Sequence, residues 1–246
     1  MLDFSRFEYF SFDCYGTLID WESGILGYLR PLLLSKACNA FDAQILELYS
    51  EYEPRQEDLR YRSYREVLAA VVDDFAREFR VEFTGDEVNG LADSIRNWEP
   101  FSDTVPALKR LRSRYKLAVL SNIDDDLFTL TAPKLEVQLN CVVTAQQVQS
   151  YKPSVCNFET LLDRLGIEKD RLLHVAESLY HDVIPAHALG IATVWVNRRQ
   201  GKTAAATKLV AAEPDLEVPT LAALADLAVS WRRSSTWKCD ILMSLT

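Results

Sequence analysis

The sequence predicts an α/β protein in which a doubly wound parallel sheet is interrupted by a long helical insert. From residue 100 onward, short apolar runs typical of buried strands alternate with helical periodicity, which is the pattern of a parallel sheet. Before that, one strand-like run near the start is followed by residues with helical periodicity and almost no strand signal. The predicted division is a discontinuous core over residues 1–20 and 99–229, an insert over 21–98 and a tail over 230–246.

The first predicted strand is the aromatic-rich run from Phe7 to Phe12, which ends at Asp13 in a loop containing Gly16. Open α/β sheets bind their ligands at the carboxyl ends of their strands, so Asp13 stands where a nucleophile would lie. Asp before Gly is also common turn chemistry. On this stretch alone, a turn-capping role for Asp13 is favoured.

Four apolar faces with helical spacing fill the insert, at residues 25–34, 41–48, 67–75 and 88–95. The insert is also rich in charged and aromatic residues, as in Tyr49-Ser50-Glu51-Tyr52-Glu53. Such a run is usually a solvated face, and a minority of its residues can face a substrate.

The alternation of strands and helices resumes after the insert. Strands are expected at 116–122, 141–144, 172–176 and 192–196. Helices are expected at 104–114, around 126–130, at 158–165 and in a segment that ends at Leu189-Gly190. Residues 230–246 depart from this pattern and are interpreted as an appended tail.

The composition excludes several classes of protein. A formal net charge of -9, from 36 acidic and 27 basic side chains, argues against nucleic acid or an anionic membrane as the main partner. No apolar run reaches the length of a membrane span, and no secretory leader is evident at the start, so a cytoplasmic location is expected. The five cysteines are scattered without CxxC spacing and indicate neither a disulfide framework nor a zinc site.

Polar residues follow four of the predicted strands. In chain order they are Asp13, Ser121-Asn122, Lys152, and the segment from Glu177 to Asp182. Because the carboxyl ends of parallel strands lie along one edge, these groups should meet in one crevice. A lysine ammonium there would favour the ionised form of a carboxylate nucleophile. Ser121 and Asn122 could donate hydrogen bonds to an anionic substrate group, and Asp182 could orient a water molecule or anchor Lys152.

Four motifs of this chain resemble those of the haloacid dehalogenase superfamily. They are Asp13-Cys14-Tyr15-Gly16-Thr17-Leu18, Leu120-Ser121-Asn122, Tyr151-Lys152-Pro153, and Val175-Ala176-Glu177-Ser178-Leu179-Tyr180-His181-Asp182. The resemblance covers roughly residues 7 to 229, with the helical insert at the position of the family's cap. It implies a Rossmann-like core, a helical cap over the crevice, and catalysis through a covalent ester on Asp13.

Within this superfamily the chain is most similar to the 2-haloacid dehalogenase branch. The phosphatases of the superfamily carry a second Asp two residues after the nucleophile, where it acts as general acid. In this chain that position is Tyr15. A phenol with a pKa of about 10 is a poor proton donor to an alkoxide-like leaving group, whereas a halide leaves without a proton. The segment Trp195-Val196-Asn197-Arg198 is also similar to that branch.

Three positions depart from the branch. The branch carries an arginine early in the cap that helps receive the halide. In this chain Ser50 stands at about that position, and Arg55 is the nearest arginine that could take over the role. Phe158 stands where a Tyr is expected after the motif lysine. Glu177 and Asp182 have the spacing of the acidic pair that holds Mg²⁺ in the phosphatases, and hard cations favour such oxygen ligands.

The favoured hypothesis is a metal-independent hydrolase that cleaves the carbon–halogen bond of a small 2-haloacid or related acid. Asp13 would be the nucleophile, Thr17 would fix its loop, Lys152 would keep it ionised, and Asp182 or His181 would orient water. Four residues are expected to bind the substrate: Tyr15, Ser121, Asn122 and Arg55.

Two alternatives stay open. The first is a Mg²⁺-dependent phosphatase for a small metabolite, with the metal held by Asp13, Glu177 and Asp182. The second is a non-catalytic binding protein on the same fold. The expected partner is a small anionic molecule rather than nucleic acid or membrane, and assembly as a homodimer is left open.

Overall fold

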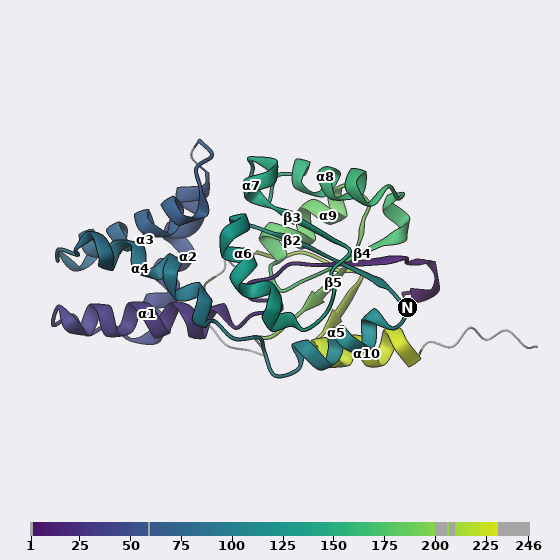
Figure 1. The fold of residues 1–246 in the computed structure, drawn as a ribbon, viewed down its shortest axis with the longest axis horizontal. Coiled ribbons are helices and arrows are strands. Elements are labelled where there is room, and N and C mark those ends of the chain that lie inside the picture. The colour runs from purple at the N-terminus through teal and green to yellow at the C-terminus, as the bar shows by residue number, and fades with distance from the viewer. Residues whose placement is uncertain (1, 59, 200–205, 207–209, 231–246) are drawn as a thin grey trace, which may run out of the picture.

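The computed structural model of the chain, which describes residues 2–58, 60–199, 206 and 210–230, contains a parallel sheet with the strand order β3-β2-β1-β4-β5-β6 (Figure 1). The strands are β1 (Tyr9–Phe12), β2 (Lys116–Ser121), β3 (Cys141–Thr144), β4 (Leu172–Ala176), β5 (Ala192–Val196) and β6 (Leu216–Val218). All five strand pairings are parallel. The predicted α/β fold is therefore confirmed, with β1 in the middle of the sheet.

Helices cover both faces of this sheet (Figure 1). On one face lie α8 (Cys156–Leu165) and α9 (Ile184–Ala188), with α7 (Ala145–Val148) beside them; on the other lie α5 (Thr104–Arg112) and α10 (Leu221–Ser230). Successive side chains of a strand point to opposite faces. Accordingly Phe10 and Phe12 of β1 belong to the core on the α5 and α10 side, whereas Tyr9 belongs to the core under α8.

The insert folds into a group of helices beside the sheet, which we call the cap helices (Figure 1). They are α1 (Trp21–Ser35), α2 (Asp42–Glu57), α3 (Tyr64–Phe79) and α4 (Gly85–Ser94). Helices α3 and α4 begin at capping boxes, in which Ser63 pairs with Glu66 and Thr84 pairs with Glu87. Each cap helix packs against two of the others, and their buried side chains are continuous with the core on the α5 and α10 side.

The sequence located the first five strands to within two residues but not the last one. Strand β6 has three residues, and its middle residue, Glu217, is exposed, so it carries almost no apolar pattern. The predicted tail begins at Ser230, which ends α10, and its residues 231–246 lie outside the described residues. Within the described ranges, none of the helices is both long enough and apolar enough to cross a membrane.

Gly24 of α1 marks a close approach between the cap helices and Trp98, which follows them in the chain. A Cβ atom at Gly24 would lie 2.5 Å from the Trp98 ring, whereas one at Gly27 of the same helix would meet nothing within 4 Å. Trp98 is buried, and its indole N–H donates to Ser94 Oγ at 3.0 Å. The ring therefore has little room to retreat.

We expect Gly24→Ala to lower the free energy of unfolding by about 1–3 kcal/mol, because overpacking displaces a buried ring. The matched Gly27→Ala should leave it unchanged or raise it by about 0.5–1 kcal/mol, because alanine favours the helix. Urea denaturation of both variants measures this difference. Equal stabilities would contradict the packing described here.

Candidate active site

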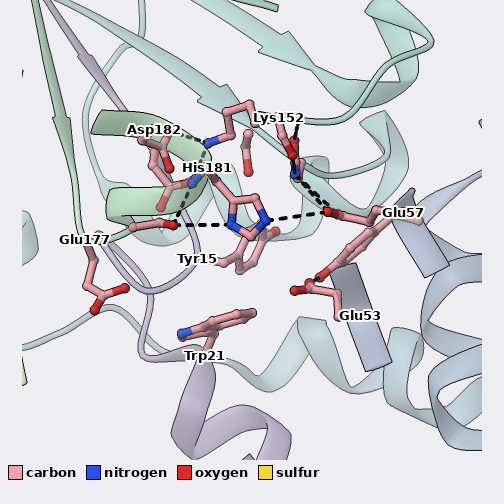
Figure 2. Close-up of a pocket in the computed structure, with 13 residues that line it drawn as sticks. Tyr15, Trp21, Glu53, Glu57, Lys152, Glu177, His181 and Asp182 are labelled. Carbon is pink, nitrogen blue, oxygen red and sulfur yellow. Dashed lines mark hydrogen bonds and ion pairs between the residues drawn. The ribbon is translucent and has the colours of Figure 1, made fainter. Parts of the chain in front are cut away.

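The site is built around the ammonium group of Lys152, which is buried between two carboxylates (Figure 2). Lys152 Nζ donates to Asp13 Oδ1 at 2.9 Å, to Asp182 Oδ1 at 2.6 Å and to the carbonyl of Leu120 at 3.1 Å. Asp13 follows β1, Leu120 belongs to β2, and Asp182 lies in the π-helical turn η5 (Leu179–Val183) after β4. Three strand ends are therefore tied together by one side chain.

Asn122 positions the backbone that carries Lys152. Its Oδ1 accepts from the Lys152 N–H at 2.7 Å, and its Nδ2 donates to the Lys152 carbonyl at 3.0 Å. The loop after β3 is thereby fixed to the end of β2.

Thr17 performs the equivalent task for Asp13. Its hydroxyl donates to Asp13 Oδ2 at 2.7 Å and accepts from the backbone N–H of Glu177 at 2.9 Å. Each Asp13 oxygen thus has one donor, from Thr17 or from Lys152, and the carboxylate is held at both ends.

Behind the site, a buried chain of polar groups supports Asp182. Its Oδ1 lies 2.9 Å from His174 Nε2, and His174 Nδ1 lies 2.8 Å from Ser11 Oγ. Phe158 packs edge-on against the His174 ring, with centroids 5.0 Å apart. Asp182 Oδ2 is buried and has no hydrogen-bond partner within the described part of the chain. That oxygen therefore keeps an unused acceptor site.

The pKa shifts follow from burial and from the single ammonium. Burial lowers and the two carboxylates raise the pKa of Lys152, and the net shift is upward, so Lys152 stays charged. Burial raises the pKa of Asp13 more than Lys152 and Thr17 lower it. Burial also raises the pKa of Asp182, but Lys152 and His174 lower it by more, so the net shift of the Asp182 pKa is downward.

Ser121 and Tyr15 line the pocket above Asp13. Ser121 Oγ is buried and has no hydrogen-bond partner among the residues described, so it can bind a ligand. The Tyr15 hydroxyl instead lies 2.8 Å from Thr131 Oγ1, and burial raises the pKa of Tyr15 well above its usual value. Tyr15 is therefore held as a neutral phenol, which is no proton donor of carboxylic-acid strength.

The cap helices contribute two carboxyl groups to the pocket, Glu53 and Glu57 of α2 (Figure 2). Glu53 Oε1 accepts from the Tyr64 hydroxyl at 2.5 Å and from the Tyr49 hydroxyl at 3.3 Å. Glu57 accepts from Asn122 Nδ2 at 3.3 Å, and its Oε2 lies 3.8 Å from His181 Nε2. Burial raises the pKa of Glu53 to about 7 and that of Glu57 well above its usual value.

Arg55, expected to bind the substrate, does not reach this pocket. Its guanidinium forms an ion pair with Asp74 at 2.8 Å, lies over the Tyr52 ring, and is 59% exposed. Arg55 lies two residues from Glu53 and from Glu57 along α2, which places it on another face of the helix. The expectation for Arg55 is corrected accordingly.

The three residues expected to hold Mg²⁺ in the phosphatase alternative line the same pocket, but their carboxylates are paired with basic side chains. Lys152 Nζ lies between Asp13 and Asp182, and Glu177 Oε1 accepts from Arg199 Nε at 2.8 Å. Figure 2 shows the Glu177 side chain turned away from Asp182. Among the residues that the structure describes, no three His, Cys, Asp or Glu side chains are grouped to hold a metal ion.

The sequence analysis missed Glu53 because it stands in a charged run, 49–53, that was interpreted as a solvated face, and it missed Glu57 one helical turn later. Glu51 is indeed exposed, but Glu53 is only 4% exposed. The missed signal is the spacing of Tyr49, Glu53 and Glu57 at four-residue intervals, which places all three on one helix face. The sequence analysis also passed over His174, whose bond to Asp182 places it in the support of the site.

Fold and site together define a Rossmann-like α/β core with an aspartate presented at the end of its central strand β1. The comparisons agree: a model of the haloacid dehalogenase-like hydrolases matches residues 7–190, so the chain belongs to this family. The (S)-2-haloacid dehalogenase of Pseudomonas sp. (strain YL) is 26% identical over 230 residues, covering 88% of this chain and 92% of that protein.

Solved structures show the same fold. The L-2-haloacid dehalogenase from Xanthobacter autotrophicus with chloropropionic acid covalently bound superposes with a TM-score of 0.76 at 18% identity, covering 92% of this chain and 100% of that one. A haloacid dehalogenase-type hydrolase from Bacillus subtilis bound to magnesium gives a TM-score of 0.75 at 15% identity, with 91% and 99% coverage. At such identities the likeness concerns the fold.

The raised pKa of Glu53 makes stability depend on pH. The folded protein holds a proton on Glu53 up to about pH 7, whereas the ordinary carboxyl pKa is 4.5. The folded state therefore binds more protons between these values, and stability falls as pH rises through this window. We expect the stability of the wild type, relative to Glu53→Gln, to fall by about 1–3 kcal/mol from pH 5 to pH 8.

Urea denaturation across that pH range measures the effect. Glu51→Gln is the matched control, because Glu51 lies on the same helix and is exposed. It should show no such trend. A constant difference between wild type and Glu53→Gln would mean that Glu53 is not protonated in the folded state.

Proposed function

We propose that this protein is a hydrolase that replaces the halogen of a small 2-haloacid, or the equivalent leaving group of a related acid, with a hydroxyl group. The observation that carries this proposal is the pair of donors on Asp13 together with Tyr15 two residues later. Lys152 and Thr17 aim and stabilise a carboxylate nucleophile, whereas Tyr15 supplies no strong acid for a leaving alcohol. A halide leaves without a proton.

In the first step an Asp13 oxygen attacks the substrate carbon. The new carbon–oxygen bond forms as the carbon–halogen bond breaks, and the halide leaves with the bonding electron pair. This step gives an ester of Asp13. It removes the negative charge of Asp13, and Lys152 keeps its ion pair with Asp182.

In the second step water attacks the ester carbonyl carbon of Asp13. Asp182 accepts the proton, since Lys152 and His174 lower its pKa and so keep it ionised, and its Oδ2 has no other partner within the described ranges. The bond between the acyl carbon and the substrate oxygen breaks, the departing alkoxide oxygen takes the proton held by Asp182, and the hydroxy acid leaves. The second proton of the water is released to solvent. Asp13 is regenerated as a carboxylate, and the overall reaction consumes one water.

The substrate's acidic group is assigned to Ser121 and to the Lys152 side of the pocket. Ser121 Oγ is a buried donor that no described residue uses, and Lys152 supplies the positive charge. The pocket volume of about 40 Å³ favours a small reacting group. Residues 21–98 form the cap domain in this proposal, and they supply Glu53 and Glu57 to the same pocket.

The two alternatives receive less support from the geometry. A phosphatase needs a metal site and a general acid, and here Glu177 is paired with Arg199 while the Tyr15 hydroxyl is paired with Thr131. If the protein only bound a ligand, the buried arrangement of Asp13, Lys152 and Asp182 would have no chemical role.

We expect Asp182→Asn to accumulate the ester, because the nucleophile is intact while the base is lost. Intact-protein mass after incubation with 2-chloropropionate should increase by one propionate group. Steady-state halide release should fall by about a hundredfold or more, the usual contribution of a general base. Asp13→Asn should show neither the adduct nor halide release.

Asp170→Asn is the control, since Asp170 is exposed and precedes β4, at the edge of the sheet opposite the site. It should keep full activity. An unmodified Asp182→Asn protein with normal halide release, or halide release by Asp13→Asn, would refute the ester mechanism.

Halide release should also persist in a metal chelator, because the positive charge beside Asp13 comes from Lys152. Parallel assays with 2-chloropropionate and with a generic phosphate ester plus Mg²⁺ measure this. Phosphate release that the chelator abolishes, in the absence of halide release, would select the phosphatase instead.

A further inference from the structure

Glu53 brings a carboxyl group into the active-site pocket from the cap, and only one of its two oxygens is engaged. Oε1 accepts from the Tyr64 hydroxyl at 2.5 Å and from the Tyr49 hydroxyl at 3.3 Å. Oε2 makes no hydrogen bond to any residue that the structure describes. Figure 2 shows the Glu53 carboxyl group reaching from α2 into the pocket, on the side of Trp21 and Tyr15.

A proton on Glu53 belongs on Oε2, because Oε1 already accepts two hydroxyl hydrogens. The Glu53 side chain is buried, and Lys152 is the one Lys or Arg among the described residues that line the pocket. The Lys152 ammonium is bound to Asp13 and Asp182. Burial therefore raises the pKa of Glu53 to about 7 without a paired cation to oppose it. In its protonated form Glu53 presents an O–H group to the pocket.

The other carboxyl group of the cap, Glu57, is engaged at both of its oxygens. Each lies 3.3 Å from Asn122 Nδ2, and Oε2 also lies 3.8 Å from His181 Nε2. Glu57 is thus occupied with groups of the core. Of the two cap carboxyl groups, Glu53 is the one with an oxygen left for a ligand.

The direction of the proposed displacement brings the leaving group toward Glu53. Asp13 is held on the core side of the pocket by Lys152 and Thr17. A group displaced from carbon departs on the side opposite the attacking oxygen, which here is the cap side. The cap residues that line the pocket are Trp21, Glu53, Glu57 and Tyr64. None of these four is a Lys or Arg, so the departing anion needs a neutral donor.

We propose that Glu53 donates a hydrogen bond from Oε2 to the departing halide, and that its contribution grows with the hydrogen-bonding strength of that halide. This inference rests on the proposed function. As the bond from Asp13 to the substrate carbon forms, the carbon–halogen bond breaks and the halide takes the bonding electron pair. The halide accepts the hydrogen bond, and the proton stays on Glu53.

Other titratable groups face Glu53 from every side of the pocket. They are Tyr49 and Glu57 of α2, Tyr64 of α3, Asp13 and Tyr15 after β1, Lys152 after α7, and Glu177, His181 and Asp182 after β4. The acidic group of the substrate adds a further negative charge, which disfavours ionisation of Glu53. The proton is therefore retained when the substrate is bound.

Rates with 2-fluoropropionate and 2-bromopropionate test the hydrogen bond. The kcat/KM value reports carbon–halogen cleavage, because hydrolysis of the ester comes afterwards. Fluoride accepts hydrogen bonds far more strongly than bromide. Glu53→Leu should therefore lower the ratio of the fluoride to the bromide kcat/KM at about pH 6 by at least about tenfold, since one donor to a developing anion is lost. A general structural defect would lower both rates alike.

The pH dependence of the same ratio tests the proton. In the wild type the ratio should fall above about pH 7, where Glu53 ionises. Ionisation of Asp13 and repulsion of the acidic substrate affect both reactions equally and cancel in the ratio. Glu53→Gln preserves the size of the side chain and has no proton to lose, so its ratio should not change with pH. This variant also serves if Glu53→Leu does not fold.

The outcomes separate this inference from the proposed function. Halide release with the same ratio in the wild type and in the Glu53 variants would refute the hydrogen bond and keep the reaction. A change of the ratio with pH that persists in Glu53→Gln would belong to another group and would also refute it. No halide release from either acid would refute the proposed function itself. Glu51→Gln, at an exposed position of α2, is the control and should behave as the wild type.

Discussion

The buried ammonium of Lys152 is the interaction on which the rest of the site depends. Taking a charged group out of water costs several kcal/mol, and two carboxylates at hydrogen-bond distance repay this cost only if their geometry is good. Asn122 fixes the Lys152 backbone, Thr17 fixes Asp13, and His174 fixes Asp182. Loss of the ammonium would leave two like charges buried together. The ends of β1, β2 and β4 and the loop after β3 are therefore held in one relative arrangement.

The cap helices meet this arrangement with carboxyl groups of their own. Glu53 is held by two tyrosine hydroxyls, and Glu57 lies between Asn122 and His181 of the core. The cap is also tied to the core at α3, where the buried Asp124 accepts from the backbone N–H groups of Tyr64 and Arg65 at 2.9 and 3.0 Å. A carboxylate at a helix N-terminus is stabilised by the helix dipole. Glu53 and Glu57 therefore lie at an interface between the cap helices and the core that several hydrogen bonds hold in place.

Much of the fold could be predicted because its signals are local. Apolar runs such as 116–121 and 172–176 mark strands buried on both faces, and the rule for parallel sheets then places Asp13, Ser121 and Asp182 at one edge. The signals failed where local pattern is weak or ambiguous. Strand β6 is too short to show a period, and Glu53 looks from its neighbours like a solvated residue. Arg55 was selected by its charge, but the helix turns it toward Asp74.

The sequence by itself determined the α/β class, the helical insert and the positions of Asp13 and Lys152 at one edge of the sheet, because each depends on periodicity or on the ends of strands. Only the tertiary structure decided which groups of the cap face Asp13, since this depends on the rotation of α2 about its axis and on its packing against Tyr64 and Asn122. It also decided the partner of Glu177, because Arg199 is distant in the chain and becomes adjacent only when β4 and β5 pair. The acidic character of the pocket is therefore a property of the packing and not of any single motif.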